Sequence, residues 1–281
     1  MANRPEVTAS AAKQPPPPTP AQRLDRLKVI VQHLSDTWPD LLQRQLTLQA
    51  LGGNKSLYDA LDKSYVAHIT NTLQGVLVID LLREIGALVL DDARGSASAA
   101  RAMSALRDPV VIAELRREYE VVPPPGNIGG DNLTVDRRAL LFTHWEQSER
   151  QVQLERFEGF RAQLTDLEKE LTASEVAEKL RTTRNKGVAH YDVVRSGDDW
   201  SLWRVEGTGL TWGQINAYVD KCSEAIEVLL ATVRHTSFDF DQSKEHAQEY
   251  VDDFIDALMR GLQSQRQEKI EKRERLLRGT E

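Results

Sequence analysis

Apolar residues recur every three or four positions through most of this 281-residue chain. That spacing places them on one face of an α-helix. The pattern is clearest at Phe157, Phe160, Leu164, Leu167 and Leu171, whose spacing is typical of a packed helix seam. Strand-like alternation is confined to residues 193–206, which could form a small β-hairpin. We therefore predict an all-α fold, a helical bundle of about six to eight helices.

The expected helices cover about 23–51, 56–90, 98–106, 109–119, 136–171, 173–184, 212–234 and 243–277. Pro39 predicts a break or kink in the first helix near Thr37 and Trp38, because proline lacks the N–H that a helix interior needs. Residues 76–88 are apolar almost all round and indicate a central core helix. Two capping boxes, Thr172-x-x-Glu175 and Thr211-x-x-Gln214, predict helix starts.

Composition divides the chain into three parts. Residues 1–22 are rich in Pro, Ala, Ser and Thr, and we expect a disordered tail because they offer little apolar surface to bury. Residues 23–240 contain most of the helical pattern and form the expected helical domain. Residues 241–281 predict an amphipathic C-terminal helix that becomes densely charged toward its end.

Charge and cysteine content exclude several classes of protein. The net charge is −7 with an isoelectric point near 5.5, so no broad nucleic-acid-binding surface is indicated. The single cysteine, Cys222, excludes an intramolecular disulfide framework and a zinc site built from cysteines. No apolar run approaches the length of a membrane span, and the N-terminus lacks a signal-peptide pattern. We expect a soluble cytoplasmic protein.

The chemistry is predicted to lie at the end of the helix that Thr172 is expected to cap. Gly187 can take the left-handed conformation that closes a helix, so Arg184 and Asn185 fall in its last turn and His190 just beyond. A guanidinium suits phosphate oxygens, an imidazole can give or take a proton near neutral pH, and a carboxamide can orient either. This set suits metal-free phosphodiester cleavage. Catalytic roles are therefore predicted for Arg184, Asn185 and His190.

Lys186 and Arg181 add positive charge beside this motif and are the predicted substrate-binding residues. An Arg followed by His within a few residues is a weak signal alone, since Arg26…His33 and Arg138…His144 satisfy it inside helical patterns. The alternative interpretation of the motif is a capped helix end with a hydrogen-bonded histidine and no catalysis.

The sequence Arg184-Asn185-Lys186-Gly187-Val188-Ala189-His190, in an all-helical chain, resembles the Arg-x(4–6)-His signature of the HEPN superfamily. More narrowly, the chain is similar to the AbiU-like branch, which is associated with abortive phage infection. The similarity also includes residues 74–106, Asp192 and the stretch Leu210-Thr211-Trp212-Gly213.

The resemblance implies a helical bundle that forms a homodimer, with two Arg/His sets in one cleft. It also implies a metal-independent endoribonuclease without a cofactor, with RNA as substrate, acting as a toxin or antiphage effector. A cognate antitoxin or other regulator would be a further partner. In this assignment Arg184 binds the phosphate, His190 acts as general acid or base, and Asn185 positions one of them. The alternative function is a non-catalytic helical dimerisation or nucleotide- or RNA-binding module.

Overall fold

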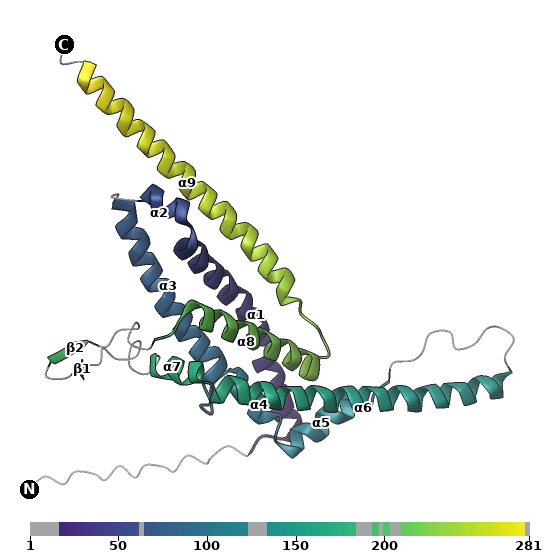
Figure 1. Ribbon diagram of the computed structural model, residues 1–281. Coiled ribbons are helices and arrows are strands. Elements are labelled where there is room, and N and C mark those ends of the chain that lie inside the picture. Colours follow the sequence, from purple (N-terminus) through teal and green to yellow (C-terminus); the bar gives the residue numbers. More distant parts are fainter. Residues whose placement is uncertain are drawn as a thin grey trace, which may run out of the picture.

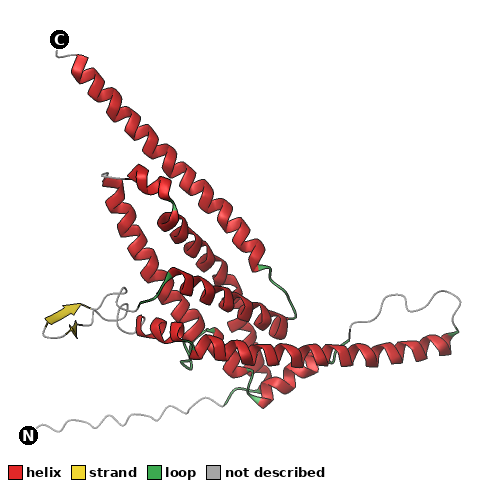
Figure 2. Ribbon diagram, viewed as in Figure 1, coloured by secondary structure: helices red, strands yellow, loops and turns green. Residues whose placement is uncertain are grey.

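The computed structural model describes residues 17–61, 65–122, 134–183, 193–196, 199–202 and 209–278. Within these ranges the chain forms the helices α1 (Pro20–Gly53), α2 (Lys55–Leu61), α3 (Tyr65–Leu90), α4 (Ala99–Ala105), α5 (Pro109–Tyr119), α6 (Val135–Ala173), α7 (Glu175–Thr183), α8 (Trp212–Arg234) and α9 (Phe240–Arg278). The predicted all-α bundle is confirmed (Figure 2). The described ranges contain one helix more than the predicted patterns, because residues 56–90 belong to both α2 and α3.

Helix α1 lies at the centre of the bundle. It packs against α3, α4, α5, α8 and α9, while α6 packs against α4, α5, α7 and α8. Figure 1 shows α1, α3 and α9 running alongside one another, with the long α6 lying across their lower end. The first half of α6 and the last turns of α9 project from the body of the bundle. In the described ranges, no helix combines the length and apolarity needed to cross a membrane.

Most buried apolar side chains form one core around α1. The predicted seam on α6 belongs to it, since Phe157, Leu164, Leu167 and Leu171 are all buried. A second, smaller cluster joins the end of α1 and α2 to α9, through Leu51, Leu57, Leu61, Val251, Ile255 and Leu262. Both clusters follow from the helical period, because each helix buries its apolar face against a neighbour.

Pro39 does not interrupt α1, so of the break or kink predicted near Thr37 and Trp38, the break is wrong. A proline inside a helix costs about 3 kcal/mol, because the carbonyl one turn earlier loses its donor. Tertiary packing offsets this cost. Trp38, Leu41 and Leu42 are fully buried, and the Trp38 Nε1–H donates to Ser223 Oγ of α8 at 2.8 Å. Burial of each such side chain contributes about 1.5–3 kcal/mol.

The prediction of a central core helix near residues 76–88 is right for one part of α3 and wrong for another. Leu81, Leu82 and Ile85 are buried against α1 and its neighbours. Val76 and Ile79, by contrast, are 58% and 41% exposed. An almost uniformly apolar helix gave no sequence signal for which side would face solvent.

A short antiparallel pair of strands lies inside the range predicted for a hairpin. Strands β1 (Val193–Ser196) and β2 (Asp199–Leu202) pair with Val193 opposite Leu202 and Ser196 opposite Asp199.

Candidate functional site

The candidate site begins at α7, the helix that leads into the predicted motif. Its first turn is capped by Ser174, whose Oγ accepts a hydrogen bond from the Ala177 N–H at 3.1 Å. The predicted capping box starting at Thr172 is therefore wrong. Helix α6 continues to Ala173, so Thr172 lies in its last turn, where its hydroxyl donates to the Glu168 carbonyl at 2.7 Å. Two polar residues, separated only by Ala173, could each have capped α7, and the end of α6 decided between them.

Helix α7 is anchored along one face. Ala177, Leu180 and Thr183 are at most 1% exposed, and the helix packs against α3, α6 and α8. The Thr183 hydroxyl is also satisfied, because it donates to the Lys179 carbonyl at 2.8 Å. The last residue of α7 is thus held in the core, and the motif starts at the next position.

Lys179 joins α7 to the chain that enters α8. Its Nζ lies 2.7 Å from a Glu175 carboxylate oxygen and donates to the Gly209 carbonyl at 3.4 Å. The hydrogen bond and positive charge of Lys179 lower the pKa of Glu175, so that carboxylate stays ionised at neutral pH. Gly209 has φ +63°, a backbone conformation that glycine adopts without strain. The described residues before and after the motif are therefore close in space.

Arg181 is the one predicted site residue that falls within the described ranges. Its side chain is 38% exposed and lies 3.6 Å from Glu178. It lines a cleft of about 470 Å³ formed by α3, α4, α6 and α7. The other lining residues are Gly86, Leu90, Asp92, Ala100, Ser104, Arg107, Glu168 and Thr172. This volume is in the range of small-ligand sites.

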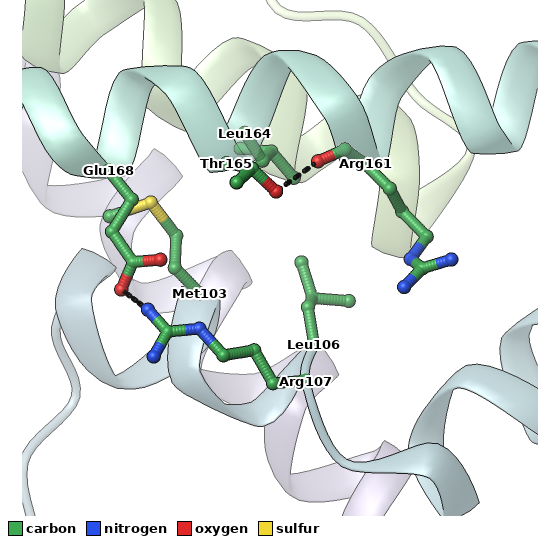
Figure 3. A pocket seen from close by; sticks show the side chains of 7 residues that line it. All are labelled: Met103, Leu106, Arg107, Arg161, Leu164, Thr165 and Glu168. Carbon is green, nitrogen blue, oxygen red and sulfur yellow. Dashed lines mark hydrogen bonds and ion pairs between the residues drawn. The ribbon is translucent and has the colours of Figure 1, made fainter.

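An ion pair between Arg107 and Glu168 crosses from α4 to α6 at the edge of this cleft. Both residues also line a separate cavity of about 60 Å³ beneath Met103, Leu106 and Leu164. Figure 3 shows the ion pair on one side of this cavity and Arg161 on the other. A space of that size holds a few water molecules and no nucleotide. Of the two spaces, only the larger cleft has room for a group of nucleotide size.

Tyr218 fixes the junction between α6 and α7. Its hydroxyl donates to the Leu171 carbonyl at 2.8 Å, and its side chain is buried. Leu171 is in the last turn of α6, where carbonyls lack partners within the helix. Burial raises the pKa of Tyr218, so the hydroxyl remains a donor through the physiological range. Helix α8 thereby supports the start of α7 as well as its face.

The remaining predicted residues, Arg184, Asn185, Lys186 and His190, lie outside the described residues. The two other Arg…His pairs lie within α1 and α6, as expected from their helical patterns. Sequence reasoning missed Asp92, Arg107 and Glu168 as cleft residues. They are far apart in the sequence, and only the packing of α3, α4 and α6 against one another brings them together.

The family model described as AbiU2, of the HEPN group, matches residues 24–254. The matched span covers most of the chain and contains every residue of the predicted motif. The resemblance to the HEPN superfamily and its AbiU-like branch is confirmed by this match. No curated protein and no solved structure matches the chain.

Proposed function

Because the chain belongs to the HEPN AbiU2 family, we propose that it is a metal-independent endoribonuclease that acts as a toxin or antiphage effector. The observation that carries this proposal is the position of the motif. The family match spans Arg184 to His190, and the complete Arg-Asn…His set stands there immediately after the buried end of α7.

The proposed reaction is attack of a ribose 2′-oxygen on the adjacent phosphorus. The P–O5′ bond breaks, which leaves a 2′,3′-cyclic phosphate and a free 5′-hydroxyl. His190 takes the proton of the 2′-hydroxyl or protonates the departing 5′-oxygen. Arg184 stabilises the negative charge on the phosphoryl oxygens, and Asn185 orients His190 or the phosphate. Every atom transferred comes from the substrate or an ionisable side chain.

The surroundings of α7 support this assignment. The chain is acidic overall, yet Lys179, Arg181, Arg184 and Lys186 fall within two helical turns of sequence. Arg181 faces an open cleft, and Lys186 directly follows the predicted catalytic pair. A local concentration of positive charge attracts RNA phosphates even when the net charge is negative. Arg181 and Lys186 are thus proposed to bind phosphates next to the scissile bond.

We further propose a homodimer, with α3 contributing to its interface. Four apolar side chains on α3 are exposed in the single chain: Ile69, Leu73, Val76 and Ile79 are 65%, 42%, 58% and 41% exposed. Their spacing places them along one side of the helix. Burying the exposed part of these side chains against a second copy would contribute on the order of 1 kcal/mol each, about half of what burial of a fully exposed side chain contributes. Because α3 also packs against α7, this contact would bring the two motifs near one another.

The test of activity is incubation of the purified protein with total RNA in the presence of EDTA. We expect cleavage products that end in a cyclic phosphate. His190→Ala and Arg184→Ala should each reduce the rate by about 10²–10⁴-fold, since each removes a group that acts only in the transition state. Arg138→Ala is the matched control, because Arg138 is exposed on α6 and also precedes a histidine. It should cleave at the wild-type rate.

If His190→Ala cleaves as fast as the wild type, the catalytic assignment is wrong. If the wild type cleaves no RNA but still dimerises, the non-catalytic module is the better interpretation. The mass in solution tests the dimer. Val76→Lys should yield monomers, whereas Val29→Lys on α1, where Val29 is 68% exposed, should leave the dimer intact. If Val76→Lys keeps the dimeric mass, as Val29→Lys is expected to, α3 is not part of the interface.

A further inference from the structure

A second cleft, separate from the one at Arg181, gathers four arginines. It lies where α1 begins, between α1, the connection from α3 to α4, α4 itself and the start of α5, and its volume is about 640 Å³. Arg23 and Arg26 come from α1, Arg94 from the connection and Arg101 from α4. We call this cleft the arginine pocket. Four guanidinium groups around one cavity are unexpected in a chain of net charge −7.

Only one carboxylate lines the arginine pocket, and it is already occupied. Asp108 lies 2.8 Å from Arg23 Nη1 and accepts a hydrogen bond from the Val110 N–H at 3.0 Å. These contacts lower the pKa of Asp108, so it is ionised and balances the charge of Arg23. The positive charges of the other three arginines are not balanced by any carboxylate that lines the pocket.

Those three arginines have no acidic partner among the residues that the structure describes. Arg26 donates to the backbone carbonyl of Arg94, which leaves its charge uncompensated. Arg94 and Arg101 form no ion pair within the described ranges. Elsewhere on the bundle, comparable arginines do have carboxylate partners, as Arg117 with Glu114 and Arg150 with Glu146. Like charges around one cavity repel, and a bound anion would relieve that repulsion.

The pocket also has an apolar floor. Leu27, Ile30 and Val111 line it and are almost fully buried, so the base of the pocket consists of packed apolar side chains. A cavity of this volume accepts a ligand of nucleotide size. Arginine is the side chain whose planar fork best matches phosphate oxygens. The combination of arginines and an apolar floor fits a ligand with a phosphate at one end and a ring system at the other.

We propose that the arginine pocket binds a nucleoside phosphate. The phosphates contact Arg26, Arg94 and Arg101, and the base lies against Leu27 and Ile30. This site differs from the cleft at Arg181. Helix α4 stands between the two, and its Ser104 borders both.

Isothermal titration with ATP at low ionic strength tests the proposal, using the Arg184→Ala protein so that the motif contributes neither phosphate binding nor turnover. We expect ATP to bind, and Arg26→Gln/Arg101→Gln in the same background to weaken binding by about tenfold or more. Arg150→Gln, which removes the same charge on the projecting part of α6, is the matched control and should bind as before. Circular dichroism and thermal melting establish that each variant is folded.

Two further ligands divide the contributions of phosphate and base. Adenosine should bind at least about tenfold more weakly than ATP, because it lacks the charge that the arginines recognise. Pyrophosphate should also bind more weakly than ATP, because it leaves the apolar floor uncovered. Equal affinity for pyrophosphate and ATP would overturn the nucleoside assignment. Absence of ATP binding, or binding that survives the double substitution unchanged, would overturn the site itself.

Discussion

Replacing Tyr218 by Phe removes one hydrogen bond at the junction that supports the motif helix. The ring stays in place, so no cavity forms, but the Leu171 carbonyl loses the donor that lies 2.8 Å from it. That carbonyl is at the end of α6 and has no helical partner to replace the hydroxyl. A net hydrogen bond contributes about 0.5–1.5 kcal/mol, and a buried acceptor left unpaired costs about 1–3 kcal/mol. We expect Tyr218→Phe to lower the free energy of unfolding by about 1–2 kcal/mol.

Urea denaturation followed by circular dichroism measures this change. The control is Tyr250→Phe, because Tyr250 is 68% exposed on α9. This substitution should change the free energy of unfolding of the protein by less than about 0.5 kcal/mol. A loss below about 0.5 kcal/mol for Tyr218→Phe would show that the hydroxyl does not support the α6 terminus. The urea concentration at the midpoint of unfolding is the quantity to compare, provided that the dependence of the unfolding free energy on urea is the same for both proteins.

The same substitution has a dependence on pH whose sign follows from the raised pKa of Tyr218. In the unfolded chain a tyrosine ionises near pH 10, whereas burial keeps this hydroxyl protonated in the folded protein well above that. Its contribution to stability is therefore complete below pH 10 and declines as the pH rises further, because unfolding then releases a proton. The difference between wild type and Tyr218→Phe should shrink above about pH 10. A difference that stays constant to about pH 11 would contradict this explanation.

Two other substitutions or treatments test the core. Trp38→Phe should lower the free energy of unfolding by about 2–4 kcal/mol in urea denaturation, because it removes volume at a fully buried position and the donor to Ser223. The control is Trp212→Phe, at a position that is 40% exposed. A loss below about 1 kcal/mol for Trp38→Phe would contradict the packing explanation. Cys222 is buried and burial raises the pKa of its thiol well above the usual range, so a disulfide reagent should label it only after unfolding. Rapid labelling of the folded protein would show that α8 opens locally.

The helical pattern predicted most of the secondary structure. The bounds predicted for α5 and α8 agree with the structure, and the Thr211–Gln214 capping box is present. These successes have a local cause. Proline at the start of α5 has no N–H that would be left unpaired, and the capping box at the start of α8 satisfies N–H groups within a few residues of sequence.

The errors arose where distant parts of the chain decided the outcome. Pro39 lies inside α1 because Trp38 is held by Ser223, far along the sequence. Thr172 failed as a cap because the seam of α6 stays buried through Leu171 and carries the helix past it. Neither residue differs in type from residues that do break or cap helices, so local sequence could not reveal the difference.

The candidate site shows the same division. The motif from Arg184 to His190 was recognisable from residue types and spacing, because its chemistry depends on groups that are close in sequence. The cleft beside Arg181 and the arginine pocket were not, since each is assembled from three or more helices.

By itself, the amino-acid order determined that this chain forms helices, where most of them begin, and which short segment carries an Arg-Asn…His set. Those properties depend on hydrogen bonds and spacings within one or two turns. Only the tertiary structure decided that one side of α3 faces solvent, that Ser174 starts α7, and that four arginines meet at one cavity. Such outcomes depend on which surfaces the packed helices cover, and that free energy comes from contacts between residues remote in the chain.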